Sequence, residues 1–191
     1  TLANAGCCQR TRISKGLLRD AKRDGLGTLT KLAGYAKLGM PILCLEPSCA
    51  SALVDDLPDL MDDDDIEIGK LVAANTFMID RFLVDQGVEL APAVGVDEVL
   101  LHGHCHQKAM FGTDAIKKAY ADMGDGNGTP SVNCEEVDSG CCGMAGAFGY
   151  EHHDLSEKIG EDRLFPAVRQ ATNDGKTVVA CGISCRHQLH D

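Results

Sequence analysis

The cysteines of this chain form a pattern that occurs twice. Seven of the ten cysteines make it up: Cys105, Cys141, Cys142 and Cys185 in the fuller copy, and Cys7, Cys8 and Cys49 in the partial one. The two adjacent pairs lie 134 residues apart, and the single cysteines that follow them lie 136 residues apart. A pattern that recurs at nearly one period indicates an internal duplication.

The same period places the start of the first copy outside this sequence. The counterpart of Cys105 would lie about 29 residues before Thr1. We therefore predict a piece of a longer protein. Residues 1–90 would form a partial first repeat, and residues 91–191 a complete second one.

Composition limits the classes of function that the chain can have. Its 191 residues are 44% hydrophobic, which suffices for one domain or two small ones. The net charge of −11 argues against a surface for nucleic acid or anionic lipid. No apolar run approaches the roughly 18 residues of a membrane span. We expect a cytoplasmic protein, either free or peripheral at the inner face of a membrane.

Short apolar segments alternate with helical ones along the chain. Strands are predicted over residues 40–45, 97–102, 132–137 and 177–180. Helices are predicted over residues 13–37, 48–58, 66–85, 107–123 and 154–171, and a glycine-containing loop over 124–130. This alternation is typical of an α/β fold. We expect two similar Rossmann-like subdomains with mostly parallel sheets.

Three of the cysteines follow a predicted strand and stand where a helix begins. They are Cys49, Cys105 and Cys185. Free N–H groups and positive potential at a helix start lower the pKa of a thiol and favour metal binding. Strand-to-helix turns line up along one edge of a parallel sheet, so ligands distant in sequence can converge there.

The adjacent cysteines favour a metal cluster over disulfides or a single zinc ion. Neighbouring cysteines close a disulfide only with strain. The chain has no Cys-x-x-Cys, the spacing typical of a structural zinc site. Glycines at 143, 146 and 149 would let the backbone approach inorganic sulfide. A single pair could be two inert buried thiols, but the repetition disfavours that interpretation.

These residues carry a family resemblance. The segments Leu101–Lys108 (LHGHCHQK), Cys141–Gly143 (CCG) and Ser184–Arg186 (SCR) resemble the cysteine-rich CCG domain. That domain occurs twice in the B subunit of heterodisulfide reductase. It also occurs in the iron–sulfur parts of glycolate and lactate oxidases and related FAD-linked 2-hydroxyacid dehydrogenases. Together with Leu45–Cys49 (LEPSC), the segments look most like the FAD-linked branch, and the resemblance covers essentially the whole chain.

The resemblance implies a cofactor and its ligands. A [4Fe–4S]-type cluster would be held by the cysteines of the fuller copy: Cys105, Cys141, Cys142 and Cys185. The partial site would consist of Cys7, Cys8 and Cys49, and it would hold zinc or nothing. Here the chain departs from the family, because Gln9 stands where the pattern has glycine. FAD would lie on another domain or on a flavoprotein partner.

Three further residues are weaker ligand candidates, namely Cys44, Cys181 and His104. Cys44 precedes Cys49 by five residues, and Cys181 precedes Cys185 by four, where the family has Cys-x-x-Cys.

The histidines at 102, 104 and 106 alternate around Cys105. Strand periodicity predicts that they share a face opposite this cysteine. We therefore expect them to form hydrogen bonds near the metal centre, in preference to binding metal.

The sequence thus predicts an electron-transfer module. It would pass electrons from a flavin, reduced by a 2-hydroxy acid such as glycolate, lactate or 2-hydroxyglutarate, to a further acceptor. Two alternatives stay open: a thiol–disulfide catalytic subunit of the heterodisulfide reductase type, and a zinc-binding or metal-free docking module. Because no flavin or dinucleotide fingerprint occurs, we expect the chain alone to be inactive.

Overall fold

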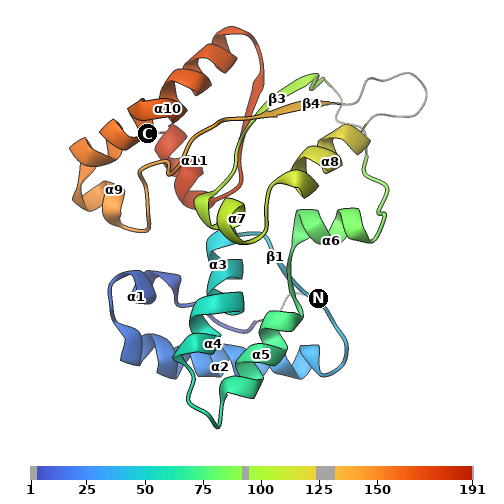
Figure 1. The fold of residues 1–191 in the computed structure, drawn as a ribbon, viewed down its shortest axis with the longest axis vertical. Helices are drawn as coiled ribbons and strands as arrows, with labels where there is room; N and C mark the ends of the chain where they lie inside the picture. The colour runs from blue at the N-terminus through green and yellow to red at the C-terminus, as the bar shows by residue number, and fades with distance from the viewer. Residues whose placement is uncertain (1–3, 92–94, 124–131, 191) are drawn as a thin grey trace. The chain divides into compact units, whose positions relative to one another are not determined.

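The computed structural model describes residues 4–91, 95–123 and 132–190 (Figure 1). The predicted loop at 124–130 lies outside the described residues. The chain divides into two compact units, Thr1–Ile79 and Asp80–Asp191. Their assignment to two repeats of one domain stays a prediction.

The first unit is mainly helical, with a two-stranded sheet. Its elements are α1 (Arg10–Ser14), α2 (Leu18–Ala36), β1 (Ile42–Cys44), α3 (Pro47–Ser51), the π-helical turn η1 (Ala52–Asp56), α4 (Leu57–Leu60), α5 (Ile66–Ala74) and β2 (Thr76–Met78). Strands β1 and β2 are parallel, with Ile42 opposite Thr76. Leu29, Leu57 and Val72 are completely buried and form the centre of this unit's core.

The predicted helix over 66–85 is wrong in its middle. Helix α5 ends at Ala74, β2 follows, and a new helix, α6, covers Ile79–Asp85. The Asn75 side chain donates to the Leu71 carbonyl, and the Thr76 hydroxyl donates to that of Val72. These bonds occupy carbonyls of the last turn, while the Asn75 carbonyl accepts the Ile42 N–H. Pairing with β1 therefore replaces helical periodicity here.

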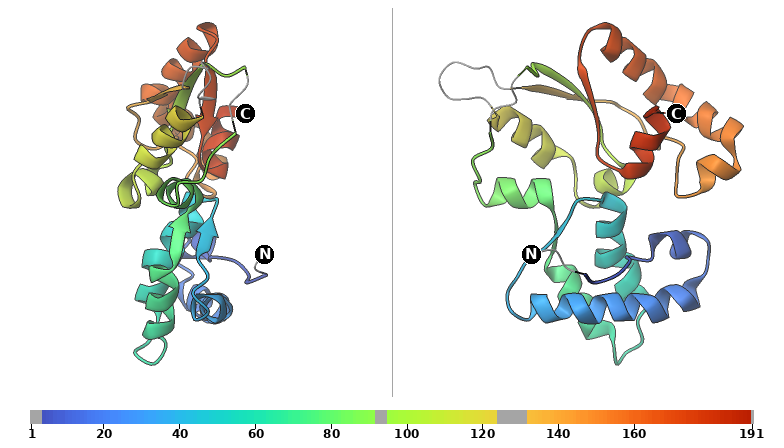
Figure 2. Two further views of the ribbon diagram at one scale, coloured as in Figure 1. Left: turned by 90° about the vertical axis from the view of Figure 1, so that its right-hand side faces the viewer. Right: turned by 180° about the vertical axis from the view of Figure 1, so that it is seen from behind.

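The second unit contains a three-stranded parallel sheet in the order β4-β3-β5. After α6, its elements are β3 (Glu98–His102), α7 (Cys105–Met110), α8 (Asp114–Asp122), β4 (Asn133–Glu136), α9 (Phe148–Glu151), α10 (His153–Asn173), β5 (Thr177–Ala180) and α11 (Ile183–His190). Helices α10 and α11 contact β5, and α8 contacts β4 (Figure 2).

Two other predicted helices are interrupted at glycines. The helix predicted over 13–37 begins earlier, at Arg10, and breaks at Gly16, whereas the one over 107–123 breaks at Gly112. These glycines have φ of +72° and +74°, a left-handed conformation that ends a helix. The expected mixture of helices and short parallel sheets is otherwise confirmed, since every strand pair among the described residues is parallel.

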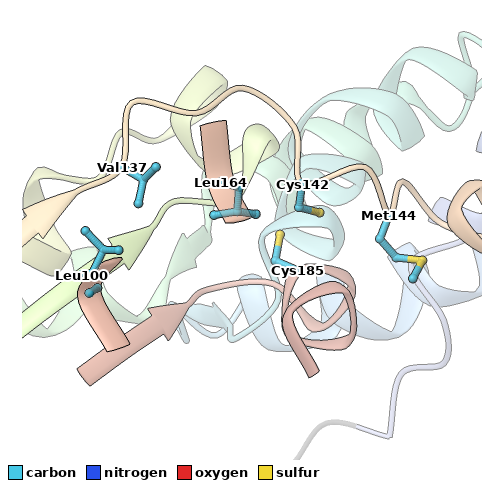
Figure 3. Close-up of a cluster of buried hydrophobic side chains, with 7 residues drawn as sticks. Leu100, Val137, Cys142, Met144, Leu164 and Cys185 are labelled. Atoms are coloured by element: carbon cyan, nitrogen blue, oxygen red, sulfur yellow. The ribbon is translucent and has the colours of Figure 1, made fainter. Parts of the chain in front are cut away.

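The core of the second unit includes two of the predicted ligands. Its buried cluster comprises Leu100, Val137, Cys142, Met144, Leu164, Ala171 and Cys185 (Figure 3). Cys142 and Cys185 are only 4% and 2% exposed. The candidate site is therefore continuous with the packing that holds this unit together.

Leu164 on α10 tests the importance of this core. Its side chain is completely buried, so Leu164→Ala should lower the free energy of unfolding by about 2–5 kcal/mol. Leu155→Ala, on the same helix but 51% exposed, should change it by less than about 0.5 kcal/mol. Urea denaturation followed by circular dichroism measures both. Equal effects would contradict the assignment of Leu164 to the core.

Candidate metal centre

The sheet of the second unit brings the predicted ligands to one edge. Strand β3 ends at His102, and Cys105 opens α7 three residues later. Strand β5 ends at Ala180, and Cys185 lies in the first turn of α11. The pair Cys141-Cys142 follows β4 after a short loop. Because the three strands are parallel, their carboxyl ends meet at the same edge.

The cysteines of the fuller copy lie near one another at this edge. The pKa of Cys141 responds to the side chains of Cys105 and Cys142. The sulfurs of Cys142 and Cys185 lie within 4.8 Å of each other. Figure 3 shows these last two side chains pointing toward each other, one from the loop after β4 and one from α11. The structure thus brings Cys142 and Cys185 together, and the assignment of all four cysteines to one metal site stays a prediction.

The electrostatics of this cluster favour thiolate at alternate positions. Hydrogen bonds from Cys105 and Cys142 hold the pKa of Cys141 well below its usual range. The hydrogen bond with Cys142 lowers the pKa of Cys185 to about 5, against the opposing effect of burial, and the neighbouring His102 ring lowers it further. The donors Cys105 and Cys142 have raised pKa values, because of these same bonds and then burial. Thiolates are the form of cysteine that binds metals.

A tight turn directs backbone toward the first cysteine of the pair. Gly143 has φ of +99°, and its N–H donates to the Cys141 sulfur over 3.3 Å. The Ser156 hydroxyl donates to the Gly143 carbonyl over 2.9 Å. A Cβ at this position would overlap the Ser156 carbonyl oxygen. Glycine is therefore required both for the conformation and for the close approach.

The first unit repeats several of these features around the partial site. The Cys8 and Cys49 sulfurs lie 2.9 Å apart, and the sulfurs of Cys142 and Cys185 lie within 4.8 Å of each other. The Gln9 N–H donates to the Cys7 sulfur over 3.4 Å. Each pair is thus followed by an N–H that points back to its first sulfur. These correspondences are what a duplication would produce.

Gln9 adopts a positive φ at the position where the second copy has Gly143. Its φ is +64°, and it is the only non-glycine residue with positive φ among the residues that the structure describes. Its side-chain amide donates to the Cys7 carbonyl over 3.0 Å and accepts from Arg12 over 2.9 Å. These bonds offset the roughly 1–2 kcal/mol cost of the left-handed conformation.

The thiols of the partial site also differ in their tendency to ionise. The hydrogen bond with Cys49 lowers the pKa of Cys8 to about 6, and the pKa of Cys49 is raised. Cys44 is buried at the end of β1, and burial followed by the charge of Cys8 raises its pKa to about 11. Cys7 is exposed. Cys44 thus lies near enough to Cys8 for that charge to affect its pKa.

Arg10 fixes the cysteine pair of the first unit to the helix that contains Cys49. Its guanidinium forms an ion pair with Asp56 and donates to the Ser51 hydroxyl over 2.9 Å. It also donates to the Ser48 carbonyl over 3.4 Å. These contacts hold α1 against the continuous helix formed by α3 and η1, and so position Cys8 beside Cys49.

Cys181 lies at the margin of the second site. Burial raises its pKa to about 11, against a hydrogen bond from the His104 backbone. The charges of Asp80 and Cys185 raise it further. Its thiol therefore lies near enough to Cys185 for that charge to affect its pKa.

The expected arrangement of the histidines is wrong. Strand β3 ends at His102, so strand periodicity does not extend to His104 and His106. The His104 Nδ1 atom accepts the His106 N–H over 3.1 Å and caps α7, and it lies 3.9 Å from the Cys105 sulfur. His102 was not among the predicted ligands, yet one of its ring nitrogens lies within 4.8 Å of the Cys142 and Cys185 sulfurs.

The donor set fits a thiolate-bound metal centre. The sulfurs of Cys142 and Cys185, both in the core, lie within 4.8 Å of each other and of a ring nitrogen of the buried His102. Cysteine thiolates hold iron–sulfur clusters and structural zinc alike. The cysteines and the histidine are therefore compatible with a metal site.

Known proteins show a consistent resemblance. The chain is 24% identical over 192 residues to the C subunit of anaerobic glycerol-3-phosphate dehydrogenase from Escherichia coli K12, covering 98% of this chain and 46% of that protein. It is 29% identical over 179 residues to D-2-hydroxyglutarate dehydrogenase of the same strain, covering 92% of this chain and 16% of that enzyme. The chain is related to parts of dehydrogenases.

These relatives are dehydrogenases or dehydrogenase subunits, which is compatible with the cysteine-rich domain inferred from the sequence. The D-2-hydroxyglutarate dehydrogenase of Pantoea ananatis gives a similar result, with 25% identity over 177 residues, covering 92% of this chain and 16% of that enzyme. The chain spans less than half the length of each of these relatives. No protein-family model matches it. Among the described residues, no helix is both long and apolar enough to cross a membrane.

Proposed function

We propose that this chain is the iron–sulfur electron-transfer module of an FAD-linked 2-hydroxyacid oxidoreductase. The observation that supports this most strongly is the proximity of the Cys142 and Cys185 sulfurs, within 4.8 Å of each other, at the carboxyl edge of the parallel sheet that also leads into Cys105 and Cys141. The similarity to D-2-hydroxyglutarate dehydrogenase supports a 2-hydroxy acid as the substrate of the whole protein. Glycolate and lactate belong to the same chemical class.

The residues of the second unit would perform three tasks for a cluster of the [4Fe–4S] type. The four thiolates would hold it, and the Gly143 N–H would donate to the sulfur of Cys141. Burial of Cys142 and Cys185 would exclude water from one side. Hydrogen bonds to sulfur and burial are the means by which a protein sets the reduction potential of such a centre. When bound, the cluster supplies a one-electron carrier.

The partners follow from this role. A flavoprotein domain or subunit would bind FAD and oxidise the substrate, and a further acceptor would take the electrons away. We place the protein in the cytoplasm, where attachment to the inner face of a membrane would depend on a partner subunit. The net charge of −11 disfavours direct attachment to anionic lipid.

Zinc is a second candidate for the partial site of the first unit. The charge of Cys8 raises the pKa of Cys44 after the larger effect of burial, and the charge of Cys44 contributes to the raised pKa of Cys49. Together with Cys7, this gives four sulfur atoms, the number that a structural zinc ion takes. Under this proposal the metal of the first unit would have a structural role.

Metal analysis of the anaerobically purified and reconstituted chain tests the proposal. We expect about four iron and four sulfide ions per chain, and an electron paramagnetic resonance signal after reduction. Stoichiometric zinc without iron would instead favour the docking module. Cleavage of a disulfide substrate by the reduced protein would favour the thiol–disulfide catalytic subunit.

A further inference from the structure

His102 has a buried ring nitrogen without a partner. The residue is 1% exposed, and its Nε2 atom is one of three buried side-chain nitrogen or oxygen atoms in the described part of the chain that meet no hydrogen-bond partner. Leaving such a group unsatisfied costs about 1–3 kcal/mol. An orphaned polar atom of this kind therefore calls for a physical explanation.

The other ring nitrogen of His102 is firmly held. Nδ1 lies 2.9 Å from the Ser139 hydroxyl. Ser139 is itself fixed, because its N–H donates to the Val137 carbonyl over 2.8 Å and its carbonyl accepts from the Lys108 ammonium group. In the tautomer with the ring proton on Nδ1, that proton is shared with the Ser139 hydroxyl and Nε2 carries the lone pair, for which no hydrogen-bond donor is present. Histidines that bind metals are oriented in this way by a hydrogen bond at the second nitrogen.

The free nitrogen belongs to a residue beside two sulfurs of the candidate site. A ring nitrogen of His102 and the sulfurs of Cys142 and Cys185 all lie within 4.8 Å of one another. A metal ion that binds nitrogen at about 2.0–2.1 Å and sulfur at about 2.3 Å can therefore contact all three. His104 is a poorer candidate, since its Nδ1 already accepts the His106 N–H.

We propose that His102 is a nitrogen ligand of this metal centre, binding through Nε2 together with Cys142 and Cys185. The inference rests on the proposed function only in requiring that the second site binds a metal. An imidazole ligand is neutral, so it would leave the centre less negative than thiolates alone. In iron–sulfur proteins, histidine ligation raises the reduction potential.

Zinc is the probe that separates this inference from the identity of the natural metal. The background chain carries Cys7→Ser, Cys8→Ser and Cys49→Ser, so that the partial site cannot bind the added ion. X-ray absorption of the zinc-loaded protein should then show sulfur at about 2.3 Å and nitrogen at about 2.0–2.1 Å, with the outer-shell scattering of an imidazole. In His102→Gln the imidazole signal should disappear, and the affinity for zinc should fall at least about 10-fold.

Three variants complete the experiment. His153→Gln removes an exposed histidine of the same unit and should leave both readouts unchanged. Ser139→Ala should weaken zinc binding while preserving the imidazole signal. His102→Cys restores a ligand, so it should bind zinc tightly with sulfur alone. It also decides the matter if His102→Gln fails to fold, because a structural histidine could not be replaced by cysteine in this metal-dependent way.

The outcomes distinguish the inference from the proposed function. An imidazole signal that persists in His102→Gln, with unchanged affinity, overturns the inference even if an iron–sulfur cluster forms in the same variant. Conversely, loss of that signal in a chain that never incorporates iron would support His102 as a ligand and refute the iron–sulfur function.

Discussion

Replacing either Cys142 or Cys185 by serine should abolish iron–sulfur reconstitution of this chain. Both side chains are buried and in contact, so each substitution removes a thiolate from a site that water cannot easily complete. Cluster binding requires several thiolates at once, and the loss of one is expected to eliminate rather than halve it. Iron and sulfide content after anaerobic reconstitution, with the visible absorption spectrum, measures the effect.

Cys134→Ser provides the matched control. Cys134 lies in β4 of the same unit, and its pKa is raised by burial, with Lys117 and Glu136 as its charged neighbours. The Cys134→Ser substitution should therefore leave iron–sulfur reconstitution unchanged. We also expect the unsubstituted chain to fill at most one site, since the partial copy lacks a counterpart of Cys105. Equal occupancy of both sites, or iron uptake indifferent to Cys142 and Cys185, would refute the ligand assignment.

Gly143→Ala should both destabilise the second unit and impair its metal binding. The left-handed conformation costs a non-glycine residue about 1–2 kcal/mol. The overlap of the new Cβ with the Ser156 carbonyl adds about 1–3 kcal/mol. The resulting backbone shift would also move the N–H that points at the Cys141 sulfur. Urea denaturation of the metal-free chain, together with metal titration, measures the two effects.

Gly146→Ala separates conformational strain from overlap. Gly146 has φ of +60°, but no atom lies within 4 Å of a Cβ built there. Gly146→Ala should therefore lower the free energy of unfolding only by the roughly 1–2 kcal/mol of the left-handed conformation, and it should retain metal affinity. If the two alanine variants behave alike, the close approach of Gly143 to Ser156 has no role in shaping the site.

The approach of Cys185 to Cys142 could be predicted because it depends on local signals. Apolar runs identified β3 and β5, and Cys105 and Cys185 stand within the first turn of the helices that follow. The parallel pairing of these strands then brings their carboxyl ends together without further information. The break in the predicted helix 66–85 could not be found in this way. Thr76–Met78 becomes a strand only through pairing with β1, a contact between distant residues.

The sequence analysis did not predict that His102 lies beside Cys142 and Cys185. It assumed that the alternation of side chains in a strand continues past the end of β3. Alternation applies only as far as β3, which ends at this residue, and His104 belongs to a helix cap. The rule that located the cysteines, that the carboxyl ends of parallel strands meet at one edge, would also have selected His102. The left-handed Gln9 had no sequence signal of its own except its place in the repeated pattern.

Cys142 and Cys185 are at once candidate ligands and members of the hydrophobic core, and this has a consequence for the lifetime of the protein in a cell. A ligand that binds only the folded state adds its binding free energy to the stability of that state. Chains of the second unit that lack metal would open more often and be digested first, because proteolysis follows the population of opened molecules. Degradation would thereby remove empty chains selectively, and the surviving pool would be enriched in loaded ones.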